Sequence, residues 1–192
     1  MPDQLSTKTD TGQIARTAPA WPGQARWAAY ATCVCTSAYG SLKLAQALGS
    51  SVLADKEPMR PDLRFHMLAR DPWFVASYWI TFGAAILGIL LALATVRPWG
   101  QHLPRWILLT TTWTLGAFMI LRAFFPVGFG FIGDTLTLTN LQQPPVQYTE
   151  LSHYLARWDL MLWSPFFLTW GLLWTTTAWH LTRATSRRIN SP

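Results

Sequence analysis

Three ionisable side chains lie inside long apolar stretches of this chain and are the residues best placed to do chemistry. They are Lys43, Arg122 and Asp159. A charge in hydrocarbon costs at least ~2.5 kcal/mol on insertion scales, so such residues are usually paired with an opposite charge or used in function. One carboxylate and two cations predict either an ion-pair cluster or a site with an excess cation for an anionic ligand.

The elements that must position these side chains are four apolar stretches, at residues 27–48, 73–96, 106–125 and 154–181. Each is long enough for an α-helix to cross a ~30 Å hydrocarbon layer. The chain is 51% hydrophobic and only 12% charged, about half the charged share of a globular protein. Several of the twelve tryptophans stand near predicted helix ends, as in the aromatic belts of membrane proteins. We therefore predict an all-α fold, an integral membrane four-helix bundle.

The distribution of the basic residues predicts the topology of these spans. Eight lie on the side that holds both termini and the second connection: Lys8, Arg16, Arg26, Arg97, Arg105, Arg183, Arg187 and Arg188. Four lie in the first connection, on the other side: Lys56, Arg60, Arg64 and Arg70. The positive-inside rule places both termini in the cytoplasm and predicts a multi-pass protein of the cell membrane. The net charge of +6 then reflects topology and contact with membrane lipid, and we expect no nucleic-acid partner.

Composition divides the chain into three parts. Residues 1–26 are polar and contain no apolar run, which predicts a disordered cytoplasmic tail without a cleavable signal peptide. Residues 27–182 form the four-span transmembrane domain, and residues 183–192 form a basic cytoplasmic tail. In the external connections, residues 61–70 predict a short interfacial helix. The alternation at residues 135–139 predicts a strand.

Helical spacing indicates that the polar side chains of the first span share one face. Its members recur every three or four residues and must face the bundle, since lipid is on the other side: Thr32, Thr36, Tyr39, Lys43 and Gln46. In the fourth span, aromatic residues that include Trp163 continue the face of Asp159. Pro165, six residues after Asp159, removes a backbone donor and is expected to kink the helix there and to free a carbonyl near Met161.

The topology brings Lys43, Arg122 and Asp159 to a similar depth near the external surface, and two interpretations remain open. In the first, they form a structural ion pair that joins spans one, three and four. In the second, they line an outward-facing cavity for an anionic or amphiphilic ligand. Lys43 and Arg122 would then contact the anion, Asp159 would orient them, and Tyr39 and Trp163 would contact the apolar part.

Other chemistry has little support in the sequence. Cys33 and Cys35 point in different directions on a helix, and the four histidines provide no pair of ligands at one depth, so we predict neither a metal site nor a cofactor. Paired catalytic carboxylates are not expected, and the protein is more readily explained as a non-enzyme. Small residues at helix-packing spacing, Ala84 with Gly88 and Thr36 with Gly40, would allow close helix contacts within the chain, in a homo-oligomer or with a membrane partner protein.

Three sequence segments carry a resemblance to a known group of proteins. They are the opening Trp27-Ala28-Ala29-Tyr30, the Leu162-Trp163-Ser164-Pro165-Phe166-Phe167 entry to the last helix, and the exit from Trp179 to Arg183. They resemble a family of small four-span membrane proteins of unknown function from high-GC Gram-positive bacteria. The resemblance implies a four-helix bundle and no catalytic residue.

These observations predict an integral membrane protein of unknown role. The leading interpretation is a non-enzymatic membrane component held together by the charged cluster near the external surface. The alternative is a transporter or a lipid- or amphiphile-binding membrane protein that uses an outward-facing cavity lined by Lys43, Arg122 and Asp159. A cavity that reaches Asp159 would favour the second interpretation, and a closed ion pair would favour the first.

Overall fold

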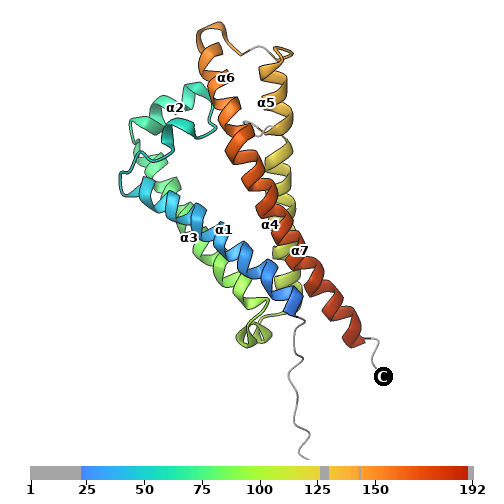
Figure 1. Ribbon diagram of the computed structural model, residues 1–192. Coiled ribbons are helices and arrows are strands. Elements are labelled where there is room, and N and C mark those ends of the chain that lie inside the picture. The colour runs from blue at the N-terminus through green and yellow to red at the C-terminus, as the bar shows by residue number, and fades with distance from the viewer. Residues whose placement is uncertain (1–22, 126–129, 143, 190–192) are drawn as a thin grey trace, which may run out of the picture.

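The computed structural model describes residues 23–125, 130–142 and 144–189, and within them every regular element is a helix (Figure 1). The predicted N-terminal tail lies outside the described residues except for its last few positions, which already belong to the first helix. The last helix runs on to Ile189, so the predicted C-terminal tail starts within it.

The first long helix, α1 (Gly23–Ala47), runs antiparallel to α3 (Pro72–Ala94), with η1 (Ala54–Lys56) and α2 (Pro61–Leu68) between them. Small residues allow the two long helices to pack closely. A Cβ on Gly40 would lie 2.9 Å from Cβ of Ala85, and one on Gly88 would lie 3.3 Å from Cγ2 of Thr36. The small residues that the sequence analysis singled out at positions 36, 40 and 88 are therefore used for packing within the chain.

The second long pair is α4 (Arg105–Phe124) and α7 (Ser164–Ile189), which also run antiparallel. The short η2 (Pro98–His102) leads into α4. Between α4 and α7 lie α5 (Phe131–Leu138), η3 (Val146–Tyr148), α6 (Thr149–Trp158) and the π-helical η4 (Asp159–Trp163). The last three helical elements, α6, η4 and α7, form one continuous rod.

The two pairs are joined mainly through α1 and α7, whereas α3 and α4 make little contact with each other. The indole N–H of Trp170 on α7 donates a hydrogen bond of 3.1 Å to Oγ1 of Thr36 on α1. Around it, bulky aromatic side chains of η4 and α7 form most of the core, together with small residues of α3 and α4: Trp163, Phe167, Trp170, Trp174, Ala92 and Ala123.

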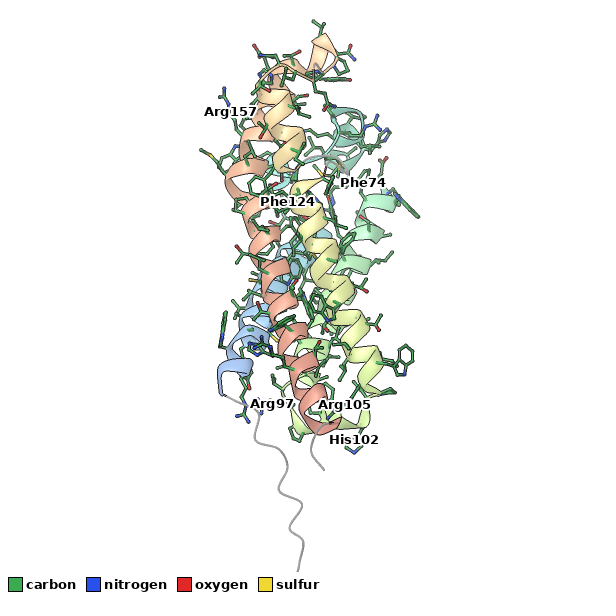
Figure 2. All side chains as sticks on the ribbon, turned by 90° about the vertical axis from the view of Figure 1, so that its right-hand side faces the viewer. Phe74, Arg97, His102, Arg105, Phe124 and Arg157 are labelled. Carbon is green, nitrogen blue, oxygen red and sulfur yellow. The ribbon has the colours of Figure 1, made fainter. Side chains whose placement is uncertain are left out.

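The start of α1, η2 and the end of α7 lie at one end of the molecule, which we call the η2 end (Figure 1). The helices α2, α5 and α6 lie at the opposite end, which we call the α5–α6 end. Labelled side chains show the same division, with Arg97, His102 and Arg105 at the η2 end and Arg157 at the α5–α6 end (Figure 2).

Helices α3 and α4 are each long and apolar enough to cross a membrane. The polar stripe predicted for the first span is turned inward: Thr32, Thr36, Lys43 and Gln46 of α1 are all buried. This arrangement confirms the prediction that these residues share an interior face, with Tyr39, which is half-buried, between them.

Two further local predictions can be compared with the structure. The short helix expected at residues 61–70 is confirmed as α2. The strand expected at residues 135–139 is wrong, because this segment is helical. Each threonine hydroxyl there donates to the carbonyl four residues earlier, as in Thr135 to Phe131 at 2.6 Å and Thr137 to Gly133 at 2.9 Å. These bonds are available only in a helix and offset the low helix propensity of β-branched residues.

Where a kink is expected at Pro165, the structure has a widened helical turn. Immediately before the proline, residues Asp159–Trp163 adopt the π-helical η4. The missing N–H of a proline cannot continue the α-helical ladder, and a single π turn is one way to accommodate it. Such turns are frequent at functional sites, and this one begins at the aspartate singled out from the sequence.

Candidate functional site

Lys43 is almost fully buried near the end of α1 and forms an ion pair with Glu57. Its Nζ also donates a hydrogen bond of 3.0 Å to Oε1 of Gln46. The amide of Gln46 in turn donates to Oε2 of Glu57 at 3.2 Å, so both oxygens of this carboxylate are satisfied. The expectation that Asp159 could be the acidic partner of Lys43 is therefore wrong: the partner comes from the first connection.

The connection after α1 is what brings Glu57 over the lysine. Arg70 donates hydrogen bonds to the carbonyls of Gln46 and Ala47, at 3.1 and 3.0 Å. These are carbonyls that the last turn of a helix leaves without intrahelical partners, so Arg70 caps α1. Gly49 follows with φ of 113°, a backbone conformation that favours glycine, and turns the chain back toward the helix.

Arg122 near the end of α4 pairs with Asp159 at the start of η4, with 3.7 Å between Nη2 and Oδ1. Asp159 is fully buried, and its Oδ2 accepts a hydrogen bond of 3.2 Å from the hydroxyl of Ser164. The guanidinium of Arg122 also lies over the ring of Phe167, 5.1 Å from its centroid. The predicted pairing of Arg122 with Asp159 thus occurs, in a closed environment.

A second buried carboxyl, that of Asp134 on α5, belongs to the same cluster and was missed by the sequence analysis. Its Oδ2 accepts a hydrogen bond of 3.1 Å from the N–H of Gly130. Its carboxyl faces that of Asp159 closely enough for the two to share a hydrogen bond when one is protonated. In the described part of the chain, the Oδ1 atom of each aspartate is buried and accepts no hydrogen bond from an N–H or O–H group. The sequence analysis considered only catalytic pairs of carboxylates and did not predict this buried pair.

The environment of Asp134 favours its neutral form. Burial is the main cause, and the nearby Asp159 adds to it, so the pKa of Asp134 is raised to about 8. The Gly130 N–H and the charge of Arg122 act in the opposite direction and are outweighed. At neutral pH the cluster of Arg122, Asp134 and Asp159 can thus hold one proton between its two carboxyls. The sequence did contain a signal that Asp134 is buried, because this residue directly follows an apolar and glycine-rich run, residues 129–133.

Tyr39 lies between the two ion pairs. Its ring centroid is 5.5 Å from Nζ of Lys43 on one side and 5.6 Å from the ring of Phe167, which underlies Arg122, on the other. Trp163 packs edge-on against Tyr39 at 6.4 Å, and its indole N–H donates a bond of 2.7 Å to the carbonyl of Lys56. The five residues predicted as a site are therefore neighbours, arranged as two separate ion pairs with aromatic rings between them.

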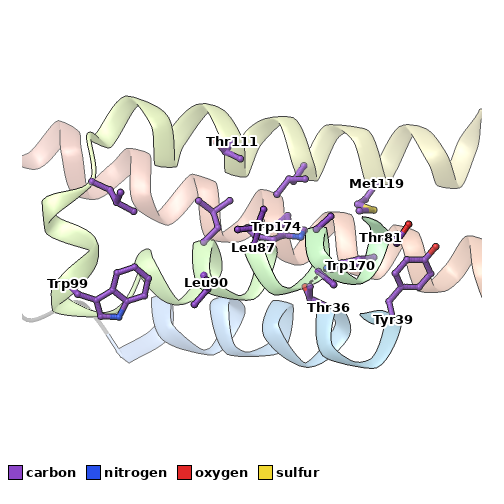
Figure 3. Close-up of a pocket in the computed structure, with 16 residues that line it drawn as sticks. Thr36, Tyr39, Thr81, Leu87, Leu90, Trp99, Thr111, Met119, Trp170 and Trp174 are labelled. Carbon is purple, nitrogen blue, oxygen red and sulfur yellow. Dashed lines mark hydrogen bonds between the residues drawn. The ribbon is translucent and has the colours of Figure 1, made fainter. Parts of the chain in front are cut away.

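A cavity of about 480 Å³ lies between α3 and α4, on the η2 side of Tyr39 (Figure 3). Its lining is almost entirely apolar and comes from all four long helices and from the η2 connection. The side chains that bound it include Thr36, Tyr39, Leu87, Leu91, Leu115, Met119, Trp99, Trp170 and Trp174. Lys43, Arg122 and Asp159 do not line it. This apolar cavity shares only Tyr39 with the predicted site.

These features define what the described residues can do chemically. The charged end is closed by its own ion pairs, which suits a structural role and the binding of a proton. The cavity offers apolar contacts and a few hydroxyls, and its volume is within the ~300–1,000 Å³ range of ligand pockets. Among the described residues, no group of three or more histidine, cysteine or acidic side chains could hold a metal ion.

Comparison with known proteins gives one match. Residues 40–174 match a protein family described as "Protein of unknown function (DUF3995)". This segment begins in α1 and ends in α7, so it includes both ion pairs, the second aspartate and nearly the whole cavity. No curated protein and no solved structure matches the chain.

Proposed function

We propose a function from the geometry of this chain, which belongs to the DUF3995 family of proteins of unknown function. The protein is a multi-pass protein of the bacterial plasma membrane that binds a lipid or similar amphiphile in the apolar cavity between α3 and α4. It acts without catalysis, as a membrane component or carrier. The two ion pairs at the α5–α6 end hold its helices together.

The membrane assignment is supported by the way polar and apolar side chains are distributed. In α3 and α4, large apolar side chains are widely exposed, such as Ile80 and Leu87 at 70% and 68%. In α1 and α7, polar residues such as Thr36 and Thr177 are buried, while apolar ones such as Val34 and Leu172 face outward. This pattern is unfavourable in water and favourable in lipid, so it supports four spans in a helix bundle: α1, α3, α4 and α7.

Charge supports the orientation of the spans. Within the described residues, every acidic side chain lies at the α5–α6 end, and the η2 end carries only basic charges: Arg26, Arg97, Arg105 and Arg183. The positive-inside rule then places the η2 end and both termini in the cytoplasm. Exposed tryptophans at helix ends, including Trp73 and Trp106, fit the headgroup regions on the two sides.

The cavity is the single observation that carries the binding role. The cavity of about 480 Å³ is open on one side and lined by apolar side chains, which gain dispersion contacts when an apolar group fills it. The side chains along its edge, Leu87 and Leu90, are exposed on the surface that would face lipid. A hydrocarbon chain from the bilayer can therefore enter from the side and fill it.

A structural component without a ligand is the second candidate. It is favoured by the closed ion pairs at the α5–α6 end, which leave Asp159 fully buried. In this case the cavity would contain only loosely held bilayer lipid. The two candidates differ in whether a lipid remains bound after extraction from the membrane.

Native mass spectrometry of the detergent-purified full chain would test this difference. We expect a retained lipid on the unmodified protein and its loss in Ala84→Phe, which places a large ring in the cavity from an exposed position on α3. Ile86→Phe is the matched control, because Ile86 is exposed on the same helix outside the cavity lining. Equal retention by both variants would reject binding in the cavity and leave the structural role.

A further inference from the structure

The cavity extends along only half of the helices that bound it. On α3 its lining runs from Thr81 to Leu91, and on α4 from Thr111 to Met119. Ten residues of α-helix span ~15 Å, which is half of the ~30 Å hydrocarbon core. Tyr39 and Thr81 lie at one end of the cavity, and Trp99 lies at the other, by the η2 connection (Figure 3). The cavity thus has the length of one leaflet and belongs to the leaflet at the η2 end.

The end of the cavity at the η2 connection is flanked by cationic side chains. Trp99 and Leu103 line it, and Arg97 and Arg105 each stand two residues away from one of them. Both arginines are exposed, and Figure 2 shows them at the same end of the molecule as His102. In the described residues no acidic side chain lies at this end, so the local charge is uniformly positive.

From this juxtaposition we propose that the occupant is an anionic phospholipid of the leaflet at the η2 end, the cytoplasmic one. One acyl chain lies in the cavity between α3 and α4, and the phosphate-bearing headgroup binds Arg97 and Arg105. The proposal rests on the proposed function and adds to it the class of the ligand, its leaflet and the residues that recognise its headgroup.

The chemistry of the two ends matches this ligand. Guanidinium groups donate several hydrogen bonds in a plane and suit phosphate oxygens, and juxtamembrane arginines attract anionic lipid. Trp99 is half-exposed at the cavity mouth, where an indole favours the headgroup level. A zwitterionic lipid offers the same acyl chain and a phosphate, but its ammonium group cancels the headgroup charge, so it would gain less binding energy from the two arginines.

Photocrosslinking separates the two parts of this ligand. The purified full chain would be placed in nanodiscs that contain a small fraction of phosphatidylglycerol or phosphatidylcholine, each with a diazirine in one acyl chain, and labelled residues would be mapped by mass spectrometry. We expect phosphatidylglycerol to label cavity residues such as Met119 and Leu115 about tenfold more than phosphatidylcholine, the size expected for two arginines acting on an anionic headgroup.

Variants test the headgroup contacts. Arg97→Gln with Arg105→Gln should lower labelling by phosphatidylglycerol to the level of phosphatidylcholine, and Arg157→Gln at the opposite end should leave it unchanged. If both lipids label the cavity equally in the unmodified protein, the anionic headgroup is rejected while binding of an acyl chain stands. If neither lipid labels the cavity, or if Ala84→Phe does not reduce labelling, the binding role itself is rejected. The comparison of the two lipids requires no variant, so it is independent of any effect on folding.

Discussion

At the scale of single residues, the cluster of Arg122, Asp134 and Asp159 is the most unusual feature of the molecule. Two fully buried carboxyls face one guanidinium. One positive charge can balance one carboxylate, so the second carboxyl is more stable as the neutral acid. A proton is therefore part of the folded structure at neutral pH, and its loss must weaken the attachment of α5.

The pH dependence of stability follows from the pKa of Asp134. The pKa is raised from its ordinary value of 3.8 to about 8, so folding favours the protonated form. The stabilisation is complete below about pH 4 and is lost as the pH rises toward 8. We expect the melting temperature in detergent to fall by at least ~5 °C between pH 5 and pH 9, because ~2 kcal/mol shifts it by this amount in a chain of this size. Asp134→Asn, which is neutral at every pH, should flatten this slope, and an equal slope in the variant would contradict the assignment.

The pair of Lys43 with Glu57 makes a separate prediction. Lys43→Met leaves the carboxylate of Glu57 buried without its cation, and Glu57→Gln leaves the lysine without its anion. Each should cost about 2–3 kcal/mol, somewhat less than the ~3–5 kcal/mol of a fully buried pair, because Glu57 is 14% exposed. The double variant should recover most of this loss in thermal unfolding. Additive losses would show that the two residues do not act as a pair.

The three buried charges could be predicted from the sequence, but their partners could not. A charged residue inside an apolar run predicts a partner of opposite charge nearby, and Arg122 and Asp159 do form such a pair. Glu57 lies in a polar connection, where acidic residues are common. Whether it pairs with Lys43 depends on how that connection folds. Asp134 was missed for another reason: the helix α5 that holds it was not predicted, because residues 135–139 were taken for a strand.

At the scale of helices, α4 and α7 meet through two glycines. A Cβ on Gly116 would lie 2.6 Å from Oγ1 of Thr175, and a Cβ on Gly171 would lie 2.7 Å from Cγ1 of Ile120 and 2.9 Å from its backbone N. Each glycine also lies close to the backbone carbonyl of the other. The closest approach of the two helices therefore depends on the absence of side chains at both positions.

Substitution of these glycines should push α4 away from α7. We expect Gly171→Ala to lower the free energy of unfolding by ~1–3 kcal/mol, the usual cost of inserting atoms into a packed interface. Gly83→Ala on α3 is the control, because a Cβ there meets no atom within 4 Å, and it should be neutral or slightly stabilising. Thermal unfolding of both variants in one detergent measures the difference. A stable Gly171→Ala variant would show that the interface can relax.

Helix positions were more predictable than helix shapes. Periodicity predicted α2, because helical spacing is a local property. Proline placement predicted a kink at Pro165, and the structure has a π turn just before it. The kind of disturbance was not predictable, because a kink and a π turn satisfy the missing N–H equally well. The helix α5 was also not predicted, because alternating threonine and leucine are typical of a strand. The hydrogen bonds from threonine hydroxyls to earlier carbonyls and the packing of α5 on α6 favour a helix here.

At the scale of the whole molecule, the proposed orientation can be tested by labelling. In a background of Cys33→Ser and Cys35→Ser, we expect Val146→Cys to react with a membrane-impermeant maleimide in intact cells, because Val146 is 94% exposed at the α5–α6 end. His102→Cys, exposed at the η2 end, should react only after the membrane is permeabilised. The reverse pattern would invert the topology and move the cavity to the outer leaflet.

The arrangement of the helices was only partly contained in the sequence. The four apolar stretches correspond to the four long helices because length and hydropathy are local properties. Which helices pair closely depends on small residues such as Gly40 and Gly116, whose partners lie far away in the chain. The cavity arises where such residues are not matched across α3 and α4, and a pattern along one segment cannot reveal a mismatch between two.

The scarcity of contact between α3 and α4 has a mechanical consequence. The two helix pairs are joined mainly along α1 and α7 and make little contact along the other edge, so the angle between the pairs depends mainly on the α1–α7 contact. In the membrane that we propose for this protein, the lateral pressure of the bilayer would act on this angle. A change in membrane tension or acyl-chain length would then alter the shape of the molecule.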